Sequence, residues 1–188
     1  MFRITIILIL FSSHITLAQT MVDLSRVSSA LTEDWNQDGN QDSFILVENP
    51  LSVDLYIIEH FGDKPDIILR ATEFTWRHED AESQPSLLLT DSENPELQIH
   101  TSIPTQDPVG WNQTISLTSY ENQWVVSGFH YGSWSHVSAE DDYFCLIRFL
   151  DGEYEKPGEF VTLNPLVIPV ASWEKYEMAS FCSPWDQW

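Results

Sequence analysis

Basic residues are scarce in this chain. Eight lysines and arginines stand against 29 aspartates and glutamates among 188 residues, which gives a formal net charge of −21 at pH 7. Proteins bind nucleic acids largely by neutralising phosphates with Lys and Arg, so the composition argues against a nucleic-acid partner and against anionic membrane surfaces. It is compatible with cation binding, with basic partners, or with solubility alone.

Cysteine is also rare, with Cys145 and Cys182 as the only two. In an exported protein an even number of cysteines allows a disulfide, and we predict that these two are bridged. Closing a loop of this length would stabilise the fold by about 4 kcal/mol in the chain-entropy model. The alternative is two separately buried thiols, because sequence does not show whether the two Cα atoms lie within bridging distance.

Long apolar runs are lacking after the N-terminus. The chain starts with the positively charged segment Met1-Phe2-Arg3. An apolar run over Ile4–Phe11 and small residues at Thr16–Ala18 follow, a layout typical of a secretory signal peptide. The run is too short to cross a bilayer core of about 30 Å. We therefore expect a signal peptide at residues 1–18, no membrane insertion after its cleavage, and a periplasmic or secreted product in which residues 19–188 form a single β-rich domain.

Glycines number only seven, and ten prolines are scattered along the chain, which opposes long helices. Short apolar runs separated by turn residues predict strands instead, and Asp151-Gly152 suits a tight hairpin turn. Weak helical patterns occur at 22–31 and 171–178, and surface loops are expected at 81–85 and 105–112. The expected strands are 43–47, 54–61, 66–74, 86–90, 97–101, 115–118, 124–131, 143–150, 153–155, 160–163 and 166–170. The predicted fold is all-β, a single compact domain of antiparallel strands arranged as a meander or sandwich.

One short segment, DWNQDGNQD at residues 34–42, carries oxygen-bearing side chains at alternate positions around Gly39. Calcium takes six to eight oxygen ligands at roughly 2.3–2.6 Å, and a glycine permits the sharp turn that aims such groups inward. We therefore predict a calcium site in this loop. The expected ligands are the side chains of Asp34, Asn36, Asp38 and Asp42 and the backbone carbonyl of Asn40.

Two alternatives bear on this loop. An EF-hand would need a bidentate Glu at the twelfth position, which is Ile45 here and belongs to an expected strand, so the helix–loop–helix interpretation fails. Magnesium would demand a tighter octahedral geometry. A metal-free turn, held by hydrogen bonds from Asx side chains to the backbone, stays open as an alternative.

The loop and the following strand SFILV resemble the calcium loop of FG-GAP or VCBS-type repeats, with Asp34, Asn36, Asp38, Gly39 and Asp42 at the matching positions. In those repeats of integrin-like β-propellers, the loop joins two antiparallel strands and calcium pins the turn. The motif occurs once here, and a propeller needs several blades of about four strands. The resemblance therefore implies one propeller-like calcium loop on a compact sheet system.

A second, less specific resemblance covers residues 115–154, with the runs ISLTSYENQWVVSGFHYGSW and YFCLIRFLDGEYE. These runs resemble the C-terminal part of small exported bacterial proteins of unknown function that carry a single such loop. The resemblance implies an aromatic strand, an Asp-Gly turn and a short closing strand.

Other groups of polar residues are candidates for catalytic or zinc sites. His130 and His136, with ligands from His100, Asp141 or Asp142, could form a zinc or hydrolase site, but histidines on a strand and its following turn are the preferred interpretation. Two groups of neighbouring residues could form acid–base pairs, but among 29 carboxylates some are expected to lie next to a histidine by chance. These pairs are Glu59 with His60, and His78 with Glu79 and Asp80.

Three functional hypotheses follow. The first is an exported, non-enzymatic protein with a structural calcium loop, in which no catalytic residue is expected. The second is a module that binds a glycan or another exported protein through exposed aromatic side chains. The third is a hydrolase around His130, His136 and Asp141 or Asp142. The tryptophans considered for sugar stacking are Trp76, Trp111, Trp124, Trp134, Trp173, Trp185 and Trp188, of which Trp124 and Trp134 are expected in the core and Trp185 and Trp188 at a core edge.

Overall fold

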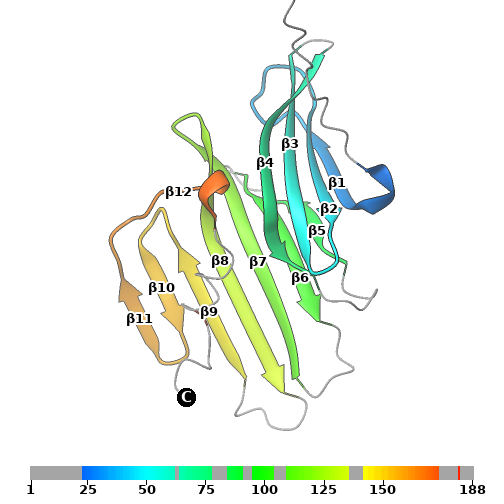
Figure 1. Ribbon diagram of the computed structural model, residues 1–188. Coiled ribbons are helices and arrows are strands. Elements are labelled where there is room, and N and C mark those ends of the chain that lie inside the picture. The colour runs from blue at the N-terminus through cyan, green and yellow to red at the C-terminus, as the bar shows by residue number, and fades with distance from the viewer. Residues whose placement is uncertain are drawn as a thin grey trace, which may run out of the picture.

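The computed structural model describes residues 23–61, 64–77, 84–90, 95–103, 109–135, 142–173 and Cys182. These residues form two antiparallel sheets (Figure 1), which confirms the predicted all-β fold. The expected signal peptide lies outside the described residues.

Sheet A has four strands in the order β1-β2-β3-β4. They are β1 (Val27–Glu33), β2 (Asp42–Glu48), β3 (Ser52–Phe61) and β4 (Lys64–Trp76). Each strand pairs with the next along the chain, because short connections favour antiparallel neighbours. A 3₁₀ turn, η1 (Leu24–Arg26), precedes β1.

Sheet B has the order β11-β10-β9-β8-β7-β6-β5, with β12 paired to β8. Its strands are β5 (Ser86–Leu89), β6 (Leu97–Ile103), β7 (Val109–Tyr120), β8 (Gln123–Ser135), β9 (Tyr143–Arg148), β10 (Glu153–Lys156), β11 (Glu159–Thr162) and β12 (Ile168–Pro169), followed by the 3₁₀ turn η3 (Val170–Ser172). Figure 1 shows β9, β10 and β11 extending away from sheet A.

The core lies between the sheets, where alternate residues of both are buried. From sheet A it takes residues such as Phe44 and Leu55, and from sheet B residues such as Ile99, Ile115 and Val126. Past the edge of sheet A, the segment after β12 covers the same face of sheet B. There Trp173 packs against Phe74, Phe129 and Phe149 at centroid distances of 6.1, 6.0 and 6.3 Å.

Two expectations about local structure were wrong. The described part of the segment 22–31 is not an α-helix, because residues from Val27 onward form β1 and pair with β2. The expected loop at 105–112 is wrong from Val109 onward, where β7 begins and pairs with β8 out to Ser135. Of the weak helical pattern at 171–178, the described part contributes only to η3, while 81–83 and 104–108 lie outside the described residues.

Candidate functional sites

The oxygen-rich loop connects β1 to β2 and is anchored on the core by Trp35. The indole of Trp35 lies 4.9 Å from the ring of Trp124 on β8 and 5.9 Å from that of Phe44 on β2, centroid to centroid. Phe44 and Trp124 also meet edge to face at 5.4 Å. Because such aromatic contacts are directional, the three rings fix the loop against both sheets.

Side-chain oxygens of the loop converge on its backbone. The N–H of Asp38 donates to Oδ1 of Asp34 and to Oδ1 of Asn36, both at 3.0 Å, and the N–H of Gly39 donates to Oδ2 of Asp34 at 3.1 Å. Asp38 Oδ1 accepts from the N–H of Asn40 at 2.8 Å. Gly39 has φ +87°, a conformation that favours glycine. These contacts are those of an Asx-rich turn, and they leave further lone pairs on each carboxylate.

Asp42 ends the loop as the first residue of β2 and is 1% exposed. Its Oδ2 accepts a hydrogen bond from the N–H of Trp35 at 3.2 Å. Its Oδ1 is buried and has no hydrogen-bond partner among the described residues. A buried, unpaired carboxylate oxygen is costly unless a proton or a cation compensates it.

A further acidic residue faces this loop, and sequence reasoning missed it. Burial, together with the negative charges of Asp42 and Asp38, raises the pKa of Glu59 on β3. The pairing of β2 with β3 brings it there, since Ser43 opposes Ile58. The neighbour of Glu59, His60, points to the opposite face of the strand, so the two do not form the acid–base pair considered above.

The carboxylates do not by themselves form a metal cage. In the described part of the chain, no three His, Cys, Asp or Glu side chains lie close enough together to hold a metal ion. A calcium ion at this loop would therefore also need the amide oxygen of Asn36, the backbone carbonyl of Asn40 and water. Those are ordinary calcium ligands.

Cys145 and Cys182 form a disulfide, with their Cα atoms 5.5 Å apart. Both residues are buried, at 0% and 1% exposure. The bridge ties the C-terminal segment to β9 on the core face of sheet B. Structural disulfides are typical of oxidising compartments.

Of the described members of the histidine constellation, His100 and His130 flank Thr114 in one row of sheet B, whereas Asp142 lies apart from them. His130 pairs with Leu146, whereas Asp142 precedes Tyr143, which pairs with Ser133. At about 3.3 Å per residue, the separation along the strands is about 10 Å or more, and Asp142 accepts from the N–H of Ser135. His136, Asp141 and the triplet at 78–80 lie outside the described residues.

The described tryptophans considered for sugar stacking do not gather on one surface. Trp76 ends β4 of sheet A, and Trp111 on β7 stacks on Tyr131 at 6.4 Å. Trp124 and Trp173 are buried on the core face, at 8% exposure each. Trp134 is half-buried, and its ring lies flat over Gly110, where it leaves no room for a Cβ. Gly110 shares a face with Thr114 and Ser116, so Trp134 belongs to the face opposite the core, contrary to expectation. Trp185 and Trp188 lie outside the described residues.

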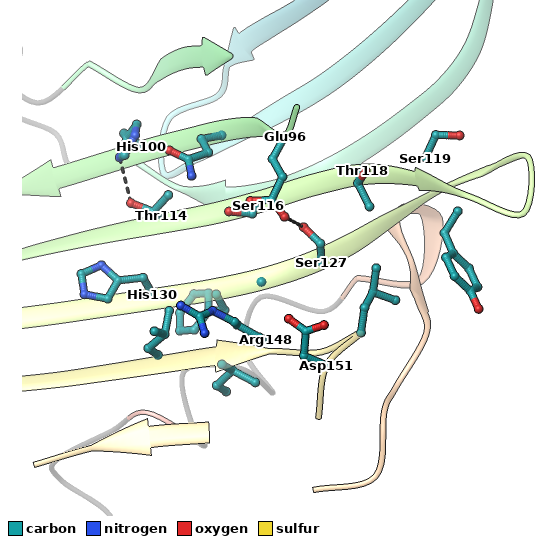
Figure 2. A pocket seen from close by; sticks show the side chains of 17 residues that line it. Glu96, His100, Thr114, Ser116, Thr118, Ser119, Ser127, His130, Arg148 and Asp151 are labelled. Atoms are coloured by element: carbon teal, nitrogen blue, oxygen red, sulfur yellow. Dashed lines mark hydrogen bonds between the residues drawn. The ribbon is translucent and has the colours of Figure 1, made fainter. Parts of the chain in front are cut away.

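That opposite face of sheet B, which we call the outer face, carries a groove over β6, β7, β8 and β9 (Figure 2). Its volume is about 760 Å³, within the usual range of ligand sites. Figure 2 shows Glu96 and Ser127 joined across the groove, and His100 joined to Thr114. Sequence reasoning missed this groove, because its residues come together only through strand register.

Comparison of the chain with protein-family models, with curated proteins and with solved structures gave no match. No helix in the described ranges has the length and apolar character required to cross a bilayer.

Proposed function

We propose that this is an exported, non-enzymatic protein whose loop at residues 34–42 binds calcium as a structural ion. The observation that carries the proposal is the buried Asp42 Oδ1, which has no partner among the described residues beside a turn lined with oxygens. A divalent cation at this point would compensate that oxygen. The resemblance of the loop to FG-GAP and VCBS calcium loops favours the same ion.

The loop is placed where an ion would act on stability. Trp35 sits between two proposed ligands, Asp34 and Asn36, and its ring contacts Trp124 and Phe44. An ion that fixes the turn therefore also fixes an aromatic contact between the sheets. Because the ion binds the folded chain preferentially, it stabilises that state by mass action.

Export is proposed on the signal-peptide pattern and the disulfide, since disulfides persist in oxidising compartments. The non-enzymatic role is proposed because Glu59 and His60 point to opposite faces of β3, and because no three His, Cys, Asp or Glu side chains of the described residues are grouped as a metal site. Expression with the natural leader, followed by mass spectrometry of the mature N-terminus, should show cleavage before Gln19. A cytoplasmic, uncleaved product would contradict export.

The calcium proposal is tested by calorimetric titration of the mature, oxidised protein with CaCl₂. We expect a dissociation constant of about 10⁻⁴ to 10⁻³ M, as for extracellular calcium modules. At a free concentration about 100 times that constant, unfolding should cost about 2.7 kcal/mol more than in chelator. Magnesium at equal concentration should produce a much smaller shift, because it dehydrates reluctantly.

Matched variants separate a site from a general charge effect. Asp38→Asn removes one carboxylate from the turn and should abolish the calcium-dependent shift. Glu155→Gln removes the same charge from an exposed position on β10 and should preserve the shift. Equal unfolding midpoints in calcium and chelator for the parent protein would refute the proposal and leave the metal-free Asx turn as the correct interpretation.

A further inference from the structure

The groove on the outer face of sheet B is a trough along its two central strands. Its floor is built from short side chains on β7, namely Thr114, Ser116 and Thr118, and from Gly128 on β8. Longer side chains on the flanking strands form its walls. They are Glu96, which immediately precedes β6, with Gln98 and His100 on β6, and Leu146 and Arg148 on β9. The register explains this cross-section, since Gln98, Ser116, Gly128 and Arg148 oppose one another in one row.

Gly128 leaves the middle of the trough open, because it has no side chain. A Cβ at this position would lie 3.2 Å from the carbonyl oxygen of Ile147 and 3.6 Å from the Cβ of Ser116. Any side chain here would therefore crowd its neighbours and fill the middle of the trough. Glycine inside a strand often marks a place where a ligand approaches the backbone closely.

A β-bulge in β8 directs the hydroxyl of Ser127 toward the trough. Gly128 opposes Ser116 and Val126 opposes Leu117, so Ser127 is an extra residue in β8. The hydroxyl of Ser127 donates to Oε1 of Glu96 at 2.6 Å, and its backbone carbonyl accepts from Phe149 at 2.8 Å. Bulges recur beside binding sites because they re-aim side chains.

The polar lining is suited to a ligand that both donates and accepts hydrogen bonds. Thr114 Oγ1 lies 2.8 Å from Nδ1 of His100, and His130 follows in the same row. Burial lowers the pKa of both histidines, so each neutral ring has one donor and one acceptor nitrogen, of which Nδ1 of His100 is already engaged with Thr114. Hydroxyl groups of a ligand have the same dual character.

Charge in the groove disfavours a strongly charged ligand. Glu96 and Asp151 line it and oppose an anion, as does the net charge of −21. The one basic side chain of the lining, Arg148, is paired with Glu153 at 2.7 Å. The carboxylate of Glu96 reaches across the groove to Ser127 and already accepts its hydroxyl hydrogen bond.

Aromatic rings stand at both ends of this face. Tyr120, 39% exposed, lines one end of the groove. Past His130, the outer face carries Trp134 over Gly110, and Phe144, 40% exposed, beside Gly132. Gly128 and Trp134 are about 20 Å apart at about 3.3 Å per residue. The C–H faces of a pyranose stack on aromatic rings, while its hydroxyls need the polar floor.

The geometry points to a binding site for a neutral oligosaccharide, which lies along β7 and β8 from Tyr120 toward Trp134. The site is separate from the calcium loop and goes beyond the proposed function. Its occupant is a neutral, polyhydroxylated chain, because the groove is rich in hydroxyls, its carboxylates oppose an anion, Tyr120 lines one end, and Trp134 lies farther along the same face.

The test is calorimetric titration of the mature protein with neutral oligosaccharides in the hexamer range: cellohexaose, xylohexaose, laminarihexaose, maltohexaose and chitohexaose. An oligogalacturonate of the same length serves as the anionic comparison. Each titration is run in calcium and in chelator, so that failure of the calcium proposal is distinguishable from failure of this one. Amide chemical-shift mapping with the tightest-binding sugar locates the site on the unaltered protein.

Two variants probe the trough and one serves as control. Ser116→Tyr fills the floor from a half-buried position, and His130→Ala removes a hydrogen-bonding side chain of β8 without adding bulk. Thr162→Tyr places the same aromatic on an exposed position of β11, outside the groove. We expect binding of at least one neutral oligosaccharide, shift changes confined to β6–β9, and a loss of about tenfold or more in both groove variants, equal to about 1.4 kcal/mol. Thr162→Tyr should bind like the parent.

The inference is overturned if none of the neutral sugars binds, if the oligogalacturonate binds more tightly than all of them, or if the shift changes map elsewhere. It is equally overturned if both groove variants bind as the parent does. Should Ser116→Tyr fail to fold, His130→Ala and the mapping decide the matter.

Discussion

A buried hydrogen bond joins the two sheets, and its removal gives a sharp test of how they are held together. Nε2 of Gln113 on β7 donates to Oγ1 of Thr75 on β4 at 2.7 Å. The two residues are 5% and 0% exposed. Thr75→Val keeps the shape of the side chain but removes the acceptor, so the amide of Gln113 is left without this partner inside the core.

The expected cost is about 1–3 kcal/mol, the usual penalty for leaving a buried polar group unsatisfied. Gln113→Leu in the Thr75→Val background removes the stranded amide as well. The double variant should therefore be less destabilised than the sum of the two single variants, with an interaction energy of about 1 kcal/mol or more. Urea unfolding followed by tryptophan fluorescence measures all four proteins.

Thr32→Val supplies the matched control, because Thr32 is exposed on β1. A change of about 0.5 kcal/mol or less is expected there. The reasoning fails if Thr75→Val unfolds at the same urea midpoint as this control. Strict additivity in the double variant would also refute it, since the two side chains would then not be coupled.

Three further predictions use the same unfolding assay. Gly152→Ala should lower the free energy of unfolding by about 2 kcal/mol or more, because φ is +68° and a Cβ would collide with the facing backbone. Gly158→Ala, at φ +75° with open space around it, should lower it by only about 1 kcal/mol. Equal losses in the two variants would contradict the collision. Replacing both cysteines with alanine should cost about 4 kcal/mol for a loop of 37 residues, and a cost near zero would mean that the bridge does not constrain the unfolded chain. Burial lowers the pKa of His100 and His130 from 6.5, so the unfolded chain binds more protons than the folded chain and stability falls as the pH drops. His130→Gln should make this decline in stability shallower between about pH 7 and about pH 5.5. An unchanged decline would exclude His130 as its source.

The strands that carry apolar runs could be predicted from sequence, but their full lengths could not. In β7, the residues from Asn112 to Thr114 are polar, and the extension of the strand depends on pairing with β8. Strands with one uncovered face carry polar residues there, so a search for apolar runs stops short. In β1, Val27, Ala30 and Leu31 have helical spacing, yet pairing with β2 decides the conformation.

The two candidate sites differ in how much sequence can reveal. The loop was visible because its oxygen-bearing residues lie within nine positions, and a short turn brings such residues together locally. The groove draws on residues from Glu96 to Asp151, and a shift of one residue in any strand would move its side chains to the other face. The position of Glu59 beside the loop escaped notice for the same reason, since only the pairing of β2 with β3 places it near Asp42.

The two sites share β8 but use opposite faces of it. Trp124 contacts Trp35 of the loop on the core face, whereas Gly128 and His130 line the groove on the outer face. Calcium would thus act on the contact between the sheets, and a saccharide would act on a surface whose shape follows from strand register. Register is fixed by the whole ladder of sheet B and by the buried row beneath it, so fixing one loop does not change it. We therefore expect calcium to raise the free energy of unfolding while it leaves the saccharide affinity unchanged below the unfolding midpoint. An affinity that follows calcium in the folded protein would show that the loop and the groove are coupled through β8.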